Sequence, residues 1–301
     1  MSAYIFGILL VFFAITLHAG ANIIDSNFSN QLFKRVSSIV FFSELVGLVF
    51  LPVVIFISHP APVSLGIAGL ILICAAIETL YLFPYYWSFR ETDTSVVASL
   101  FSLGKIFVPT LAFFIVGERL APLQYVGIVI IIFSSIALTF DFKQRRLNQA
   151  FFMMLGVSIM LAVESVLYKY IFDQGVSWGT VIFWASIFQF LIAASFMFSP
   201  KNRVDLGVAR NHIKSFGYLF ILEEALSWFG EVASIVAISL IPVSIVEGVG
   251  AAQPLFVLLY ALLFKRIYPK LFKESTELND MAHKSVYFGL IIIGTIVIVM
   301  K

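Results

Sequence analysis

Long apolar runs, separated by short polar or proline-containing gaps, follow one another along almost the whole chain. A run of about 20 apolar residues can cross a bilayer, and in lipid it must be helical to satisfy its backbone polar groups. The pattern predicts an all-α polytopic membrane protein with ten transmembrane helices. The predicted spans are residues 3–21, 36–57, 64–88, 94–117, 121–140, 150–172, 178–198, 215–240, 243–264 and 284–300.

The second half of the chain repeats features of the first half in the same order. SVVA at 95–98 corresponds to SIVE at 244–247, and YVGIVIIIFSSIAL at 125–138 parallels YFGLIIIGTIVIVM at 287–300. Each repeat then contains five spans, and an odd number of spans places the second copy upside down. We therefore expect one integral membrane domain built from two inverted five-helix repeats, residues 1–145 and 146–301.

Composition leaves no room for a soluble domain. The 301 residues are 61% hydrophobic and 12% charged, about half the charged fraction of a soluble protein. A net charge of +2 without a basic patch gives no indication of a nucleic-acid partner. Cys74 is the single cysteine, which excludes an internal disulfide and a cysteine metal site. The first run has no basic residues before it, so we interpret it as a mature span rather than a cleaved signal.

The segment TDTSVVASLFSLGKIFVPTLAFFIVGERLAPLQYVG (92–127) resembles the EamA-type members of the drug/metabolite transporter (DMT) superfamily. In that family a span of small residues precedes a Gly-Glu-Arg-Leu-x-Pro turn, here residues 117–122. VSIVEGVGAAQPLFVLL (243–259) resembles the second copy, and the likeness extends over the whole chain. It implies a secondary transporter of small metabolites in a bacterial inner membrane. Two departures are Lys105, where the family usually has proline, and the missing second Gly-Glu-Arg turn.

The Gly-Glu-Arg turn also has a direct physical interpretation. Gly117 can adopt the conformation that ends a helix, and Pro122 suits the first turn of the next helix. Glu118 and Arg119 would lie at the membrane interface, where charge is tolerated. We therefore expect a structural role for this turn.

Ionisable residues concentrate in some spans and are missing from others. The fifth span and, after Lys284, the tenth span hold none except tyrosines near their starts. This predicts that these two helices are peripheral and face lipid or a second copy in a homodimer. The seventh span has no charge either. The remaining spans hold the ionisable residues His18, Glu44, Glu78, Lys105, Glu164, Glu223, Glu224, Glu231 and Glu247. Intramembrane ionisable residues mark ion or substrate pathways by default.

Helical spacing places several of these residues on common faces, because residues three, four and seven apart share a face. The predicted stripes are Glu224, Trp228 and Glu231; Glu78, Tyr81 and Tyr85; Glu164 and Tyr168; and Ser95, Ser99 and Ser102, with Lys105 displaced around the helix. The first three stripes are the predicted substrate-binding residues. Together they predict a central cavity that holds water and a small solute.

A second group is predicted to serve in coupling or ion pairing: Lys105, Glu247, Glu44 and His18. An unpaired ammonium in low dielectric is unfavourable, so Lys105 needs a partner, and Glu78, Glu231 and Glu247 are all candidates. We hypothesise that substrate or a proton competes with Lys105 for that acid.

Each residue also has a structural alternative. Glu44 fits a hydrogen-bonded link between helices equally well, and His18 fits a satisfied interior histidine better than a proton relay. Glu223 points about 100° away from Glu224, which favours a helix contact. The remaining alternatives concern aromatic residues: packing or interface roles for Trp87, Trp178 and Trp184, and an aromatic belt for Tyr85 and Tyr86.

These patterns favour a transporter that works by alternating access on an amine, an amino acid or another cationic or zwitterionic solute, with proton coupling or exchange. The chain has no phosphate-binding loop, so ATP does not drive it, and we expect no cofactor and no metal. A flippase for lipid-linked headgroups is the main alternative. An enzyme is disfavoured because the histidines are scattered and no zinc motif is present. A channel is disfavoured because the charges form no repeated ring.

Orientation is left open by two opposed indications. Fifteen of the nineteen lysine and arginine residues lie in the odd-numbered loops, and three lie on the other side. The positive-inside rule then places both termini outside the cytoplasm. The family resemblance favours cytoplasmic termini.

Overall fold

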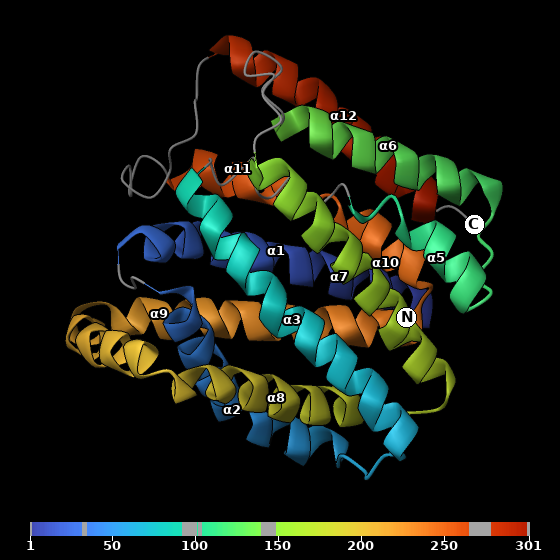
Figure 1. Cartoon of the computed structure of the whole chain (residues 1–301). Helices are drawn as coiled ribbons and strands as arrows, with labels where there is room; N and C mark the ends of the chain where they lie inside the picture. Colours follow the sequence, from blue (N-terminus) through green and yellow to red (C-terminus); the bar gives the residue numbers. More distant parts are fainter. Residues whose placement is uncertain are drawn as a thin grey trace.

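The computed structural model describes residues 2–31, 35–91, 101, 104–139, 149–264 and 278–299, and their regular elements are all helical (Figure 1). The elements are α1 (Ala3–Gln31), α2 (Val36–Ser58), α3 (Leu65–Glu91), α5 (Val108–Ile115), α6 (Pro122–Thr139), α7 (Gln149–Asp173), α8 (Trp178–Ser195), the 3-10 turn η2 (Phe196–Phe198), α9 (Pro200–Leu240), α10 (Val243–Gly250), α11 (Gln253–Phe264) and α12 (Leu278–Val299). The all-helical prediction is confirmed for these residues.

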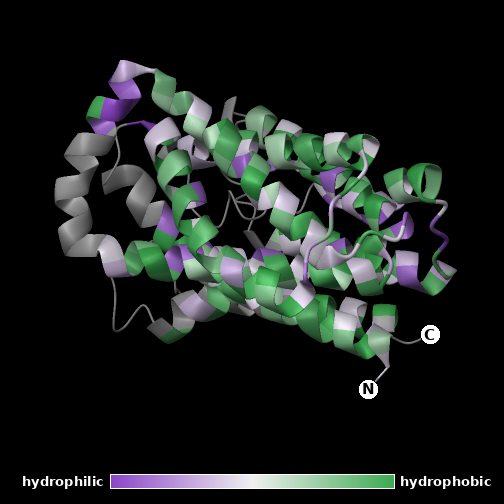
Figure 2. Ribbon diagram, turned by 90° about the horizontal axis from the view of Figure 1, so that it is seen from below, coloured by the Kyte–Doolittle hydropathy of each residue, from purple (hydrophilic) through white to green (hydrophobic). Residues whose placement is uncertain are grey.

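Six segments of the described chain are long and apolar enough to cross a membrane. They are Ala3–Asp25, Val36–Ser58, Leu65–Ser88, Phe152–Asp173, Trp178–Phe198 and Val243–Tyr260. Two shorter apolar helices, Pro122–Ala137 and Gly289–Ile298, belong to the fifth and tenth predicted spans. Figure 2 shows the hydrophobic residues spread along the helices.

Two helices, α1 and α9, extend ten or more residues beyond their predicted bounds. α1 continues past the predicted end at residue 21 to Gln31, so Asn22 and Asp25 are helical. α9 begins at Pro200, so the predicted connection 199–214 is part of a 41-residue helix. Proline is well tolerated in a first helical turn, where its missing N–H has no intrahelical partner, and Ser199-Pro200 therefore starts α9 instead of opening a loop.

The fourth and ninth predicted spans are interrupted. A turn at Lys105–Phe107 precedes α5, and Ala251 and Ala252 separate α10 from α11. The second residue of the helix after each break is a proline, Pro109 in α5 and Pro254 in α11. A proline in a helix interior removes a hydrogen bond and clashes with the preceding turn, so both helices restart just before it. The predicted serine stripe (Ser95, Ser99, Ser102) lies outside the described residues.

The helices pack in pairs that combine the two halves of the chain. α6 packs against α12 at one side of the molecule, and α2 packs against α8 at the opposite side (Figure 1). Between them, α1 packs against α9 and α3 packs against α7, while α5 contacts both α7 and α10. The two ends of the chain lie together, as Figures 1 and 2 show, and the Tyr4 hydroxyl donates to the Ile298 carbonyl at 3.0 Å.

The α6–α12 pair depends on two glycines that face each other. A Cβ added at Gly127 would lie 2.8 Å from the Gly294 carbonyl oxygen, and one added at Gly294 would lie 2.9 Å from the Gly127 carbonyl oxygen. Small residues at such contacts let membrane helices approach closely. The remaining faces of these helices expose apolar side chains: Leu123, Val126, Val129, Phe133, Ile292, Ile293 and Ile296.

Candidate functional site

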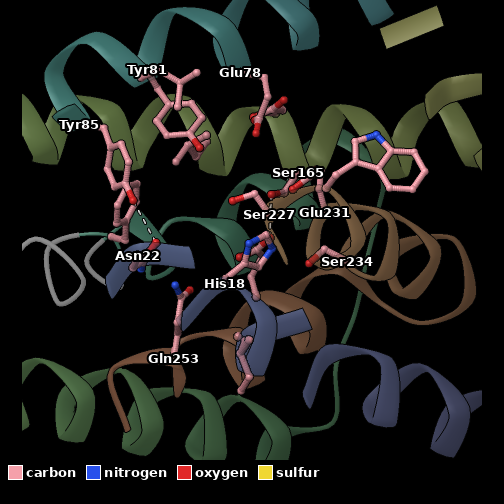
Figure 3. A pocket seen from close by; sticks show the side chains of 18 of the residues that line it. His18, Asn22, Glu78, Tyr81, Tyr85, Ser165, Ser227, Glu231, Ser234 and Gln253 are labelled. Carbon is pink, nitrogen blue, oxygen red and sulfur yellow. Dashed lines mark hydrogen bonds between the residues drawn. The ribbon is translucent and has the colours of Figure 1, made fainter. Parts of the chain in front are cut away.

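A cavity of about 280 Å³ lies among the middle helices and the α5–α10 region (Figure 3). The structure brings all twelve predicted residues into its lining: His18, Glu44, Glu78, Tyr81, Tyr85, Lys105, Glu164, Tyr168, Glu224, Trp228, Glu231 and Glu247. They come from α1, α2, α3, α7, α9, α10 and the turn before α5. Their shared location is a structural finding, and their individual roles stay predictions.

The stripes of α3 and α7 face each other across this cavity. Glu78 and Glu164 lie close enough for the charge of one carboxyl group to act on the other. Glu164 is 3% exposed, and its Oε1 atom has no hydrogen-bond partner among the described residues. Tyr81 continues the α3 stripe and packs against Tyr85 with ring centroids 6.0 Å apart. This part of the wall therefore combines closely spaced acids with aromatic rings.

The α9 stripe supplies the opposing acids. Figure 3 shows Ser227, Glu231 and Ser234 directed into the same space as His18. Trp228 lies against Phe50 of α2, with ring centroids 5.4 Å apart. The hydroxyl of Ser43, also on α2, donates to Glu224 Oε1.

The sequence favoured a helix contact for Glu223. In the structure, its side chain also lines the cavity. Ser227, one helical turn later, donates to Glu223 Oε1 at 2.9 Å. Glu223 is 2% exposed, and Oε2 has no partner among the described residues. The cavity therefore extends around α9 farther than a single stripe would allow, and Glu223 and Glu224 both reach it.

Lys105 pairs with Glu247, one of the three partners that the sequence left open. Its Nζ atom lies 3.0 Å from Glu247 Oε2, and the Ser165 hydroxyl donates to Glu247 Oε1 at 2.7 Å. Gly250 makes room for the ammonium, because a Cβ there would lie 2.8 Å from Lys105 Nζ. Since Gly250 is the last residue of α10, the positive charge lies at the end of a helix where a cation is favourable.

The other end of α10 is held by the Gly-Glu-Arg turn. Glu118 accepts hydrogen bonds from the backbone N–H groups of Val243 and Ser244, at 2.8 and 3.0 Å. Gly117 has a φ of +68°, and Pro122 begins α6, as the sequence predicted for this turn. A carboxylate at a helix N-terminus satisfies otherwise unpaired N–H groups and interacts favourably with the helix dipole. Residues from the first half thus hold both ends of α10.

Two residues of the lining, the acid Asp25 and its neighbour Asn22, were not predicted from the sequence. The two follow His18 at the i+7 and i+4 positions of α1, so a longer predicted first helix would have placed all three on one face. Tyr86 was also overlooked as a lining residue. Tyr85 and Tyr86 are both buried and both donate to Asp25, so the aromatic-belt alternative is wrong for this pair.

The three tryptophans interpreted as packing residues, Trp87, Trp178 and Trp184, are not among the residues that line this cavity. Trp184 donates its ring N–H to the Ala61 carbonyl at 3.1 Å, which ties α8 to the chain before α3. This contact fits a packing role for Trp184.

The lining has a large excess of acids over bases. Its acids are Asp25, Glu44, Glu78, Glu164, Glu223, Glu224, Glu231 and Glu247, and its bases are Lys105 and His18. Within the described part of the chain, no group of three metal-ligating side chains is arranged to hold a metal ion. Like charges this close cannot all be ionised without compensation, so the cavity is suited to protons or to an organic cation.

Comparison with known proteins agrees with this architecture. Residues 5–140 match the EamA-like transporter family, which confirms the predicted resemblance for that part of the chain. A solved structure titled "Crystal structure of protein" matches with a TM-score of 0.65 and 13% identity, covering 97% of this chain and 96% of that one. At this identity the likeness concerns the fold alone. The comparison with curated proteins gave no match. The family match and the apolar helices together show an integral membrane protein.

Proposed function

Starting from the match to the EamA-like transporter family, we propose that this chain is a secondary transporter for a small cationic or zwitterionic solute, such as an amine or an amino acid. The observation that carries the proposal is the excess of carboxyl groups in one cavity. Burying so many acids without counter-charge is unfavourable, and a cationic solute would supply the missing charge. The volume of about 280 Å³ suits one small molecule.

The walls suggest how such a solute is held. Glu78, Glu164 and Glu231 would bind an ammonium group through charge-assisted hydrogen bonds. The rings of Tyr81, Tyr168 and Trp228 would add cation–π contacts. In a zwitterion, the carboxylate would compete with Glu247 for Lys105, which is the hypothesis made from the sequence.

Alternating access would follow from ten spans arranged as inverted repeats, residues 1–145 and 146–301. The packing pairs support this arrangement. If each element is exchanged for its counterpart five spans away, the α1–α9 pair becomes the α7–α3 pair, and the α2–α8 and α6–α12 pairs map onto themselves. The interrupted helices lie at corresponding positions of the two halves, next to the cavity, where transporters of this design bind their substrates.

The driving force in this proposal is a proton gradient or solute exchange, and the membrane is a bacterial inner membrane. No cofactor takes part. The exposed apolar faces of α6 and α12 are the surface proposed for a homodimer, because they are peripheral and expose apolar side chains such as Phe133 and Ile292.

The test is a thermal-shift screen of the purified protein against amines, amino acids, nucleosides and sugars at two pH values. A stabilising amine or amino acid is then taken into proteoliposome transport. Glu231→Gln should abolish accumulation while the protein still folds. Asp173→Asn is the matched control, because Asp173 is paired with Lys169 at 3.3 Å, is not part of the cavity lining and should transport normally. Stabilisation by sugars or nucleosides alone, or normal accumulation by Glu231→Gln, would contradict the proposal.

One observation favours the flippase alternative. An apolar groove of about 380 Å³ lies between α5 and α6, lined by Ile106, Pro109, Thr110, Phe113, Tyr125, Ile128, Val129, Ile132 and Phe133. Such a groove could accept a lipid tail while a headgroup occupies the cavity. A vesicle assay that compares free solutes with lipid-linked substrates separates the two functions, since only a flippase would move the lipid-linked form.

A further inference from the structure

Asp25 lies in the acidic lining but outside the groups assigned to the solute. It is 4% exposed and lies on α1, two turns after His18. Its Oδ2 atom lies 2.8 Å from the Tyr85 hydroxyl, and its Oδ1 atom lies 3.1 Å from the Tyr86 hydroxyl. The Tyr85 hydroxyl also lies 3.0 Å from Asn22 Oδ1, as the dashed line in Figure 3 marks.

The hydrogen count of this cluster depends on whether Asp25 carries a proton. A tyrosine hydroxyl has one hydrogen, and neither an ionised carboxylate nor the amide oxygen of Asn22 can donate one. With Asp25 ionised, Tyr85 can donate to Asp25 or to Asn22, and one of these contacts then lacks a hydrogen. With Asp25 protonated, Oδ2–H donates to the Tyr85 oxygen, and Tyr85 donates to Asn22. The protonated form therefore satisfies both close contacts at once.

Among the residues that the structure describes, the neighbours of Asp25 supply no compensating cation. α3 contributes Tyr81, Tyr85 and Tyr86, and α9 contributes Glu223 and Glu224, whose charges act on Asp25 or on its tyrosines. α10 and α11 also pack against α1. They contribute Glu247, already paired with Lys105, and the neutral side chain of Gln253. Around Asp25, the described residues therefore place acids and neutral groups only.

Glu223 gives a second, independent indication that this cluster binds a proton or a water molecule that donates a hydrogen bond. Its Oε2 atom is buried in the cavity wall without a partner among the described residues, although Oε1 accepts from Ser227. An orphaned carboxylate oxygen is costly, so this atom needs a donor from the cavity. Asp25, Glu223 and Glu224 thus form an acidic cluster that is incomplete unless hydrogen is supplied to it.

Tyrosine rings connect this cluster with the solute residues. Tyr81 packs edge-on against Tyr85, and the Phe101 ring lies against both, with centroids 6.2 and 5.4 Å away. The Tyr81 hydroxyl is influenced by Asp25 as well as by Glu78, Glu164 and Glu231. A charge at one cluster is therefore felt at the other, because the dielectric of such an interior is low.

We propose that Asp25 is the site at which the transporter binds its coupling proton, separate from the solute residues, and that Tyr85 switches its donated hydrogen between Asp25 and Asn22 as the proton leaves and returns. This inference rests on the proposed function for its physiological role. When a monovalent cation enters beside Glu78, Glu164 and Glu231, the Asp25 O–H bond breaks and the proton passes to water. The cavity gains one positive charge and loses one.

The chemical part is tested without any solute by infrared difference spectroscopy of the purified protein between acidic and alkaline pH. The wild-type spectrum should contain a carboxylic C=O band that is missing from Asp25→Asn, together with a shifted tyrosine ring mode that is missing from Tyr85→Phe. Tyr86→Phe is the matched control, because Tyr86 has one acceptor and should retain both signals. A tyrosine shift that persists in Asp25→Asn or Tyr85→Phe overturns the switch.

The transport part uses labelled tetramethylammonium in proteoliposomes, because the charge of this probe does not change with pH. Asp25→Asn should lose accumulation driven by a pH gradient at least tenfold and retain counterflow exchange. Accumulation equal to wild type would overturn Asp25 as the coupling site. A wild-type protein that neither binds nor moves the probe would contradict the proposed cation specificity instead, and the infrared result would still decide the proton site.

Discussion

Glu118, in the first half of the chain, caps the N-terminus of α10 by accepting the backbone N–H of Val243 at 2.8 Å. The two residues are 125 positions apart in the sequence, so the Gly-Glu-Arg turn stabilises a helix in the other half of the chain. α10 has eight residues and ends where the interruption at Ala251 begins. So short a helix has little intrinsic stability, and external partners at its ends decide whether it forms.

Removing this cap should destabilise α10 without affecting the charge of the cavity. Glu118→Ala leaves the N–H groups of Val243 and Ser244 without their acceptor, and loss of a capping residue costs about 1 kcal/mol. We expect a lower thermal unfolding temperature in detergent and slower transport. Arg119→Ala is the control, because Arg119 is exposed and contacts the face of Phe113 at 5.8 Å. Equal stability of the two variants would mean that the cap contributes nothing.

Breaking the Lys105–Glu247 pair should affect both stability and transport. Lys105→Met leaves the Glu247 carboxylate without its cation, and losing a hydrogen bond to a charged group costs about 2 kcal/mol. The pair is partly accessible, with side chains 19% and 17% exposed, so cavity water will soften the effect. We expect Lys105→Met to transport poorly and to change the pH dependence of uptake.

The double variant Lys105→Met/Glu247→Gln isolates the pair, because it removes both charges together. Its unfolding temperature should return most of the way to the wild-type value, while transport stays impaired. If the single variant keeps wild-type transport with an unchanged pH profile, then competition for Glu247 is not part of the mechanism.

The close α6–α12 contact predicts that a larger residue at Gly127 destabilises the protein through packing alone. Gly127→Ala places a Cβ against the Gly294 carbonyl, which is backbone and cannot rotate aside. Overpacking of this kind costs about 1–3 kcal/mol, more than the helix propensity that alanine adds. Gly289→Ala on α12 is the matched control, because nothing lies within 4 Å of its added Cβ. Detergent unfolding should show Gly127→Ala destabilised and Gly289→Ala unchanged or slightly stabilised.

Local periodicity and residue type were enough to predict twelve residues that face the cavity, although Asn22, Asp25 and Tyr86 were missed. Glu224, Trp228 and Glu231 share a face because helix geometry fixes their relative directions, whatever the helix packs against. Residue type then indicated the inward direction, since acids avoid lipid. The same reasoning could not select the partner of Lys105. Three acids satisfied it, and the choice of Glu247 depends on where the turn before α5 meets α10.

The errors arose where hydropathy was used to locate helix ends. Asn22 and Asp25 lower the apolar character of α1, so the first span was ended at residue 21 and the acid nearest to Tyr85 was overlooked. The break at Ala251 was overlooked for the opposite reason, because small apolar residues are compatible with a continuous helix. Pro254 was the available signal, since the helix must restart close to it.

The orientation of the chain in the membrane can be determined by cysteine labelling, because its one native cysteine should not react with the label. Cys74 is buried, so a membrane-impermeant maleimide should not reach it in the folded protein. Ser2 and Val204 are exposed and lie near opposite ends of their spans, so cysteines there should report opposite sides. The charge count predicts that Ser2→Cys is labelled from outside intact spheroplasts and that Val204→Cys is labelled only after permeabilisation. The reverse pattern would place the termini in the cytoplasm, as in the relatives that the sequence resembles, and would show that the basic loops do not set the topology here.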